Sequence, residues 1–173
     1  MMPKITPDTP ILYLDYDGCL HPGLVYRTAK RGIHLRGYPG HTLFEWAPIL
    51  VRLLAPWPDV KIILSTTWVR AVGFSESKER LPRELQRPVA GATWHSEMIR
   101  RVEEWEASAR FQQIIAHVQR HELTNWIAID DDDMGWPDIL RDRLVKCSEH
   151  LRLREPEVQA DLAKKLEMLN QKQ

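Results

Sequence analysis

The stretch ILYLDYDG, residues 11–18, decides the fold expected for this chain. Its apolar residues run without interruption and stop at Asp15, the pattern of a strand that is buried on both faces of a parallel sheet. Gly18 permits a turn directly after the strand, so the carboxylates of Asp15 and Asp17 can reach one crevice. These residues indicate either a site at the strand end or an ordinary turn, because Asp and Gly are common turn formers.

Two further apolar runs end in the same abrupt way. The run VKIIL (residues 60–64) stops at Ser-Thr-Thr (65–67), and WIAI (126–129) stops at consecutive aspartates (130–133). A weaker apolar run covers residues 144–147. Each run has the length of a buried strand, so the polar residues that follow it belong to strand ends.

Helical patterns separate these runs. Apolar residues recur with the helical period over residues 47–55, over 111–118 with Ser108 as the expected N-cap, and over 158–169. The alternation of strands and helices predicts a three-layer, Rossmann-like α/β fold with a mainly parallel sheet, in one domain that spans residues 1–173. Ligands of such folds bind at the carboxyl ends of the strands.

The strand ends offer groups for a metal and for a phosphate. Four adjacent carboxylates repel one another, and a divalent cation such as Mg²⁺ accounts for them better than a solvated acidic loop does. The Ser65 hydroxyl and the amides after it can cradle an anion. Arg110 stands in the first turn of a predicted helix, where a cation opposes the helix dipole. A bound phosphate nearby would offset this unfavourable interaction. An exposed Arg110 that costs little stability accounts for the pattern equally well.

Composition narrows the class of protein. The 173 residues include 24 Lys+Arg and 24 Asp+Glu, and 43% are hydrophobic, which is ordinary globular usage. No apolar run approaches the roughly 18 residues that span a bilayer, and the start does not resemble a signal peptide. Two cysteines make no disulfide framework, so we expect a cytoplasmic protein without membrane partners. The balanced charge argues against broad binding to nucleic acid, although residues 26–41 are locally basic and form either a solvated flap or a lid that contacts phosphate.

Aromatic residues and histidines give weaker indications. Seven tryptophans are many for this length, and we expect most of them in the core. Trp68 and Trp94 are the two that we consider as surfaces for stacking on bases. His21, just past DYDG, either touches substrate or packs within its loop.

Taken in order, these motifs resemble the haloacid-dehalogenase (HAD) superfamily of phosphohydrolases. The stretches LDYDGCLHP, LSTTWVR and WIAIDDDD are similar to the HAD domains of RNA-repair-associated proteins, and IAIDDD also resembles the phosphatase half of polynucleotide kinase-phosphatases. The resemblance runs from Asp15 to Asp131 and implies the HAD fold. Neither segment between the motifs has room for a large cap domain, which implies an open site that admits a nucleic-acid end.

The resemblance also implies catalytic roles. Asp15 would be the nucleophile that forms an aspartyl-phosphate, and Asp17 would protonate the leaving group and then activate water. Ser65, helped by the amide of Thr66, would hydrogen-bond the transferring phosphoryl group. Gly18 would lie against the substrate at the turn.

A basic residue and a metal complete the implied site. Arg110 occupies the place where the family usually has Lys, and Arg70 is its rival; Trp68 would contact the substrate. Mg²⁺ would be bound by the carboxylates of Asp15 and Asp130 and by the carbonyl of Asp17. Asp131 would assist directly or through the other ligands.

The sequence therefore predicts a Mg²⁺-dependent phosphomonoesterase that acts on nucleotide or nucleic-acid-end phosphates. Two alternatives stay open. Clustered carboxylates such as Asp15, Asp17 and Asp130 also serve two-metal nucleases. A non-catalytic phosphate-recognition module is the second alternative.

Overall fold

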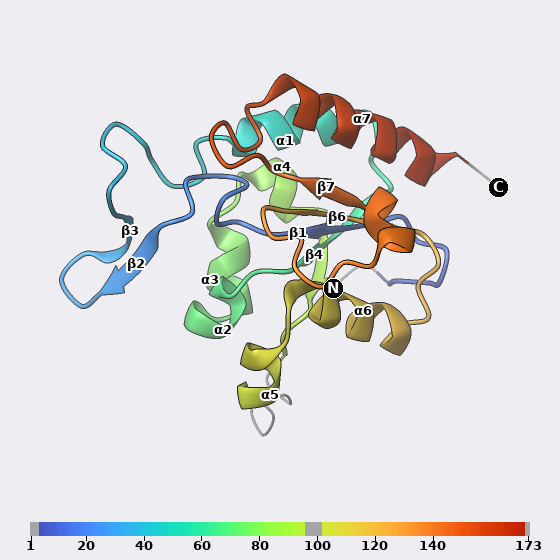
Figure 1. Ribbon diagram of the computed structural model, residues 1–173, viewed down its shortest axis with the longest axis horizontal. Coiled ribbons are helices and arrows are strands. Elements are labelled where there is room, and N and C mark those ends of the chain that lie inside the picture. Colours follow the sequence, from blue (N-terminus) through green and yellow to red (C-terminus); the bar gives the residue numbers. More distant parts are fainter. Residues whose placement is uncertain (1–3, 96–101, 172–173) are drawn as a thin grey trace.

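A five-stranded parallel sheet forms the centre of the computed structural model, which describes residues 4–95 and 102–171 (Figure 1). Its order is β5-β4-β1-β6-β7, and each neighbouring pair runs parallel. The strands are β1 (Ile11–Leu14), β4 (Lys61–Leu64), β5 (Val89–Ala92), β6 (Trp126–Asp130) and β7 (Leu144–Lys146). The predicted mainly parallel α/β sheet is confirmed.

Helices cover both faces of the sheet (Figure 1). Helices α1 (Ala47–Leu54) and α7 (Pro156–Asn170) lie on one face, and α6 (Arg110–Arg120) lies on the other. The shorter elements are α2 (Trp68–Val72), α3 (Phe74–Glu79), α4 (Arg83–Gln86), α5 (Val102–Ala107) and the 3-10 helix η2 (Asp138–Arg143). Among the described residues, no helix has both the length and the apolar character needed to cross a bilayer.

The central strand explains why its apolar run is continuous. Ile11 and Tyr13 pack into the core beneath α6, whereas Leu12 and Leu14 pack into the core beneath α1 and α7. All four side chains are fully buried. A strand covered on both faces has no solvent-facing positions, so its sequence does not alternate.

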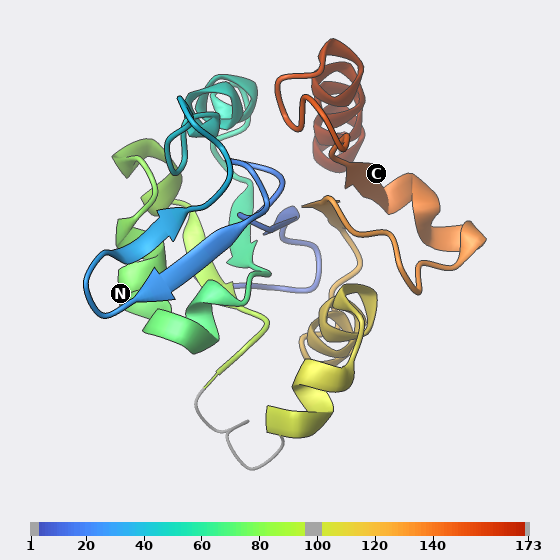
Figure 2. The ribbon, with the colours of Figure 1, turned by 60° about the vertical axis from the view of Figure 1, so that its left-hand side comes forward.

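A β-hairpin stands outside the sheet, between β1 and α1 (Figure 2). It consists of β2 (Val25–Thr28) and β3 (Gly32–Leu35), which pair antiparallel. This hairpin occupies most of the basic segment for which we expect a flap or a lid. Nothing larger caps the strand ends in the described part of the chain, in agreement with the expected lack of a large cap domain.

Two local expectations need correction. Helix α6 has Ala109, not Ser108, at its N-cap. The Ser108 hydroxyl donates to the carbonyl of Trp105 (2.6 Å), while the Gln112 side chain accepts from the Ala109 amide (3.0 Å). Trp68 and Trp94 are 3% and 8% exposed, so neither offers a free face on which a base could stack.

Helix α7 gives a test of core packing. Leu166 lies on the face of α7 that packs against the sheet, and its side chain is fully buried. Leu166→Ala should lower the free energy of unfolding by about 2–5 kcal/mol, because the deletion leaves a cavity. Met168, on the same helix, is 57% exposed, and Met168→Ala should change that free energy by no more than about 0.5 kcal/mol. Urea denaturation measures both, and equal losses would contradict the packing described here.

Candidate active site

The loop after β1 sends alternate side chains in opposite directions. Asp15 lies at the strand end and is 4% exposed. Tyr16 turns into the core, where its hydroxyl donates to the carbonyl of Ser77 (2.9 Å). Asp17 is again directed to the strand-end side, and Gly18 has a φ of +77°, a left-handed conformation that suits glycine. The alternation is what brings both carboxylates of DYDG to one edge of the sheet.

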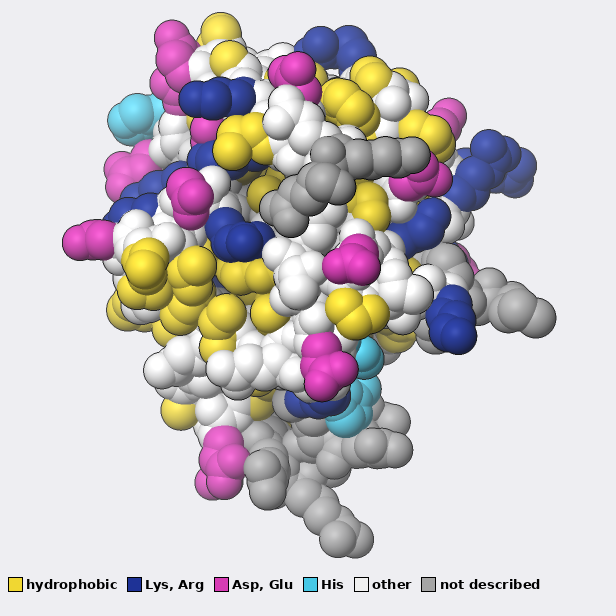
Figure 3. Space-filling model, turned by 90° about the vertical axis from the view of Figure 1, so that its right-hand side faces the viewer, with side chains coloured by type: hydrophobic (Ala, Val, Ile, Leu, Met, Phe, Trp, Pro, Cys, Tyr) yellow, Lys and Arg dark blue, Asp and Glu magenta, His cyan; other side chains and the backbone are white. Residues whose placement is uncertain are grey.

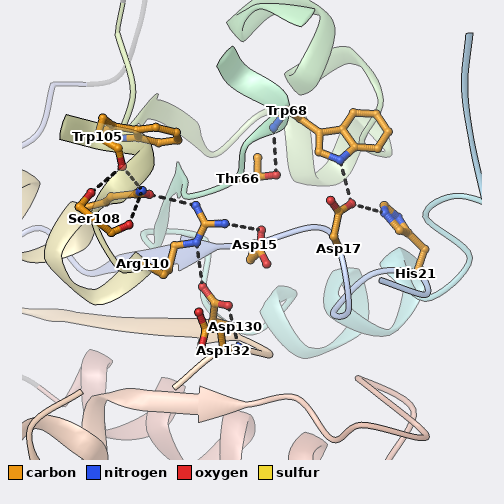
Figure 4. Close-up of polar contacts among 11 residues, drawn as sticks. Asp15, Asp17, His21, Thr66, Trp68, Trp105, Ser108, Arg110, Asp130 and Asp132 are labelled. Atoms are coloured by element: carbon orange, nitrogen blue, oxygen red, sulfur yellow. Dashed lines mark hydrogen bonds and ion pairs between the residues drawn. The ribbon is translucent and has the colours of Figure 1, made fainter. Parts of the chain in front are cut away.

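Arg110 joins the first strand end to the third (Figure 4). Its Nη2 lies 3.6 Å from Asp15 Oδ1, and its Nε lies 3.2 Å from Asp130 Oδ2. Its Nη1 donates to Gln113 Oε1 (3.1 Å), and the Gln113 amide in turn donates to the carbonyl of Trp105 (3.0 Å). The guanidinium is therefore held between two buried carboxylates, at the place where the sequence predicted a basic residue.

Arg70, the rival of Arg110, takes a different position. It forms an ion pair with Glu106 of α5, and both side chains are more than 40% exposed. No ion pair joins Arg70 to the strand-end carboxylates in the described part of the chain. Of the two arginines, the structure brings Arg110 to Asp15 and Asp130.

The four consecutive aspartates divide into two pairs with different surroundings. Asp132 has a structural contact, since its Oδ1 accepts from the amide of Met134 (2.9 Å). Asp133 lies outside the cluster and pairs with Lys146 Nζ (2.8 Å). The solvated acidic loop that we considered is thus realised at Asp133, whereas Asp130 and Asp131 face the strand ends.

Asp131 is held by a residue that the sequence did not single out. Arg152, from the loop between β7 and α7, donates through Nη1 to Asp131 Oδ2 (3.1 Å). A β-carbon on residue 18 would lie 1.9 Å from that same oxygen, so Gly18 is needed for space as well as for its backbone conformation. No sequence pattern marks Arg152, because it is far along the chain from every motif.

Three carboxylates form a candidate metal site. Asp15, Asp130 and Asp131 each offer an oxygen, and these atoms lie within 4.8 Å of one another. Asp130 Oδ2 is buried and receives no hydrogen bond, since its contact with Arg110 is an ion pair without hydrogen-bond geometry. When all of them are ionised, these three carboxylates and that of Asp17 carry two more charges than the guanidinium groups of Arg110 and Arg152. An all-oxygen, doubly negative cluster fits a hard divalent cation such as Mg²⁺.

Burial makes this cluster costly without a cation. It raises the pKa of Asp15 well above its ordinary value; the Asp130 charge adds to this and Arg110 opposes it. Burial likewise raises the pKa of Asp130 to about 7, against the lowering effect of Arg110 and of the Asp132 amide. Buried carboxylates with raised pKa values are typical of sites where a charge is neutralised in function.

Asp17 is fixed through one of its two oxygens. Its Oδ1 accepts from the indole N–H of Trp68 (2.8 Å) and lies 2.9 Å from His21 Nε2 (Figure 4). The amide of Phe44 donates to His21 Nδ1 (3.1 Å), which assigns the imidazole proton to Nε2, facing Asp17. Trp68 and His21 thus orient Asp17, and its Oδ2 takes part in neither contact.

Hydroxyl groups line the ends of β4 and β5. The buried Ser65 Oγ, which follows β4, has no hydrogen-bond partner among the described residues. Thr66 is also buried, and its Oγ1 accepts from the Trp68 amide (3.4 Å). Thr93 after β5 has a buried, unpartnered hydroxyl too, which the sequence missed because β5 (VAGA) is too small in its side chains to look like a strand. Unpaired buried hydroxyls can donate to a bound anion.

A parallel sheet with this order, an Asp-x-Asp loop after its central strand and paired aspartates after the neighbouring strand define a domain of the HAD class. Within it, residues 11–158 match the family described as the HAD domain in Swiss Army Knife RNA repair proteins, and the chain belongs to that family. A search of curated proteins found no match.

The raised pKa of Asp130 predicts how metal-free stability depends on pH. A carboxyl group whose pKa is higher in the folded state costs stability as the pH rises from about 4 through about 7. With a chelator present, Asp130→Asn should therefore melt at a higher temperature than wild type at pH 7.5, and the difference should shrink towards pH 4.5. Burial lowers the pKa of His117 to about 3, so this residue also makes stability depend on pH. Its contribution is the same in both proteins and cancels in the difference between their melting temperatures.

Addition of Mg²⁺ at pH 7.5 should raise the melting temperature of wild type and not that of Asp130→Asn. Thermal denaturation measures each condition. A wild-type protein that is indifferent to Mg²⁺, Mn²⁺ and Ca²⁺ would contradict a metal site at Asp130.

The contact between Gly18 and Asp131 predicts a second effect. Gly18→Ala adds a β-carbon that must displace the Asp131 carboxylate, and it strains a backbone at φ +77°. We expect the midpoint of the Mg²⁺ stabilisation to rise at least about tenfold, a loss of about 1.4 kcal/mol in binding. Gly23→Ala is the control, because a β-carbon there has no neighbour nearer than 3.8 Å. Equal midpoints for the two variants would contradict this role of Gly18.

Proposed function

We propose that this chain is a Mg²⁺-dependent phosphomonoesterase that acts through an aspartyl-phosphate on the terminal phosphate of a nucleotide or nucleic acid. One observation carries the proposal: Asp15 and Asp130 share the guanidinium of Arg110 at neighbouring strand ends, with Asp17 fixed beside them. Family membership supports phosphohydrolase chemistry. The chemistry follows from these positions.

Asp15 acts as the nucleophile in the first half-reaction. One of its oxygens attacks phosphorus, the bond from phosphorus to the leaving-group oxygen breaks, and a mixed anhydride forms on Asp15. Asp17 Oδ2, which the contacts from Trp68 and His21 leave free, gives its proton to the leaving group. In the second half, the same oxygen of Asp17 takes a proton from water, and the water oxygen attacks phosphorus. The bond between phosphorus and the Asp15 oxygen breaks, which restores the Asp15 carboxylate and releases inorganic phosphate.

Cationic and neutral donors hold the phosphoryl group during both steps. Phosphoryl transfer depends chiefly on positioning and on neutralising the charge of the equatorial oxygens. The Arg110 guanidinium, the Ser65 hydroxyl and the Thr66 amide supply such donors. Arg in place of the usual Lys keeps the charge permanent and can engage two oxygens at once.

The candidate metal site belongs to the same machinery. Asp15, Asp130 and Asp131, with the carbonyl of Asp17, would hold Mg²⁺, which neutralises and orients a phosphoryl oxygen when bound. Arg152 positions Asp131, and Gly18 leaves the space that Asp131 occupies.

The proposed substrate class rests on two observations. The family is that of HAD domains in RNA repair proteins, which favours a phosphorylated nucleic-acid end. The described part of the chain has no large cap domain over the strand ends, so a phosphate on a long chain can reach them.

The nucleophile provides the decisive test. Asp15→Asn should lower kcat at least about 10⁴-fold, as expected for loss of a nucleophile, while the protein stays folded because the change removes a buried charge. Asp133→Asn is the matched control in the same chain, since Asp133 lies outside the site, and it should keep kcat within about twofold. Phosphate release is measured on 3′- and 5′-phosphorylated oligonucleotides, on nucleotides and on an aryl phosphate, with and without Mg²⁺.

Each alternative has its own outcome in this experiment. Undiminished turnover by Asp15→Asn would end the aspartyl-phosphate mechanism, whereas capture of beryllofluoride in a Mg²⁺- and Asp15-dependent manner would support it. Internal cleavage of RNA would identify a nuclease. Release of phosphate from none of the substrates would favour a phosphate-recognition module.

A further inference from the structure

The hairpin carries charge of a single sign. Residues 18–44 contain no Asp or Glu, and they include four basic residues: Arg27, Lys30, Arg31 and Arg36. All four are exposed, and none of them forms an ion pair within the described chain. The face at the other end of the molecule mixes acidic and basic side chains (Figure 3), in keeping with a net charge of zero. The hairpin is therefore a local cationic surface on a neutral protein.

A cleft lies on this hairpin, and its lining combines cations with an aromatic ring. It has a volume of about 320 Å³, and its walls include Tyr26, Arg31, His34 and Arg36. The Arg36 guanidinium carbon lies 5.2 Å from the centre of the Tyr26 ring, and Tyr26 is 42% exposed. Guanidinium groups pair with phosphate oxygens, and an exposed ring offers a face for a base. The lining thus fits an anion that also has flat aromatic groups.

The hairpin is anchored to the candidate active site. The amide of Phe44, just past the basic segment, donates to His21, and His21 contacts Asp17. Arg27 Nη1 on the hairpin donates to the carbonyl of Ala71 in α2 (2.8 Å), the helix that begins at Trp68. His21 and helix α2, which contact the hairpin and the chain just after it, therefore also hold Asp17, the latter through Trp68. The hairpin follows the loop after β1 that carries Asp15 and Asp17, and it projects from the body of the protein (Figure 2).

We propose that the hairpin cleft binds the internal nucleotides of a single-stranded polynucleotide, with Arg31 and Arg36 on backbone phosphates and Tyr26 against a base. The inference rests on the proposed function, because it takes the terminal phosphate to lie at Asp15. It names the substrate class more narrowly: an oligonucleotide end, in preference to a mononucleotide. An acidic peptide would satisfy the charge, but it would make no use of the exposed ring or of a phosphate site.

The test is the double variant Arg31→Ala/Arg36→Ala, with Arg83→Ala/Arg87→Ala as the control. The control removes the same charge from exposed arginines at α4, outside the cleft. We compare kcat/KM for a phosphorylated ten-nucleotide RNA with that for an aryl phosphate. The ratio of the two should fall at least about tenfold in the hairpin variant and stay within twofold of wild type in the control. In the hairpin variant, kcat/KM for the RNA should also depend less steeply on salt than in wild type, because fewer backbone phosphates are neutralised.

The opposite results are as clear. An oligonucleotide and its terminal mononucleotide hydrolysed with the same kcat/KM by wild type would overturn the inference. So would equal losses in the two double variants, which would indicate only long-range attraction. If neither the phosphorylated RNA nor the aryl phosphate is hydrolysed, the proposed function fails, and the cleft is judged by binding alone.

For that purpose, fluorescence anisotropy measures binding of the labelled RNA to wild type and to both double variants. Weaker binding by the hairpin variant only, at least about tenfold in Kd, supports the cleft independently of turnover. Equal binding by all three proteins overturns it. Displacement of the RNA by polyglutamate of the same charge, with equal affinity, would assign the cleft to an acidic protein segment instead.

Discussion

Repulsion between buried carboxylates is the constraint on which the rest of the site depends. Asp15, Asp130 and Asp131 bring oxygen atoms within 4.8 Å of one another, and at least two of the three groups are almost fully buried. Burial weakens the screening that water provides, so the cluster needs cations. Arg110 enters from α6 and Arg152 from the loop before α7. The remaining negative charge matches a divalent cation, and this requirement draws four separate chain segments to one sheet edge.

The buried carboxylates are distinct from the groups that would transfer protons and bind substrate. Asp17 lies at the rim, fixed through a single oxygen by Trp68 and His21. The same histidine accepts a hydrogen bond from the chain that returns from the basic hairpin. One imidazole thus connects the carboxylate that would transfer protons to the surface that would receive a polyanion. The residues that we propose for chemistry and those that we propose for substrate choice are thus connected in this fold but distinct.

Much of the site was predictable because each buried parallel strand is an apolar run that stops at the polar residues of its carboxyl end. The runs before Asp15, Ser65 and Asp130 are continuous since both sheet faces are covered, and each stops where the chain emerges at the edge. Other parts carried no such signal. Strand β5 is built from small residues, and the hairpin strands are short and mostly exposed. Arg152 lies far from every motif in the sequence, and the true cap of α6 is an alanine.

By itself the sequence determined the class of fold, the order of its strand ends and the residue types that could hold phosphate and metal. These follow from local patterns, since a strand buried on both faces and the turn after it are each recognisable from residues adjacent in the chain. Only the tertiary structure decided that Arg110 and not Arg70 meets Asp15, that two of the four consecutive aspartates turn inward, and that Trp68 orients Asp17 instead of offering a stacking face. Such choices depend on distances between residues far apart in the chain, and packing alone sets those distances.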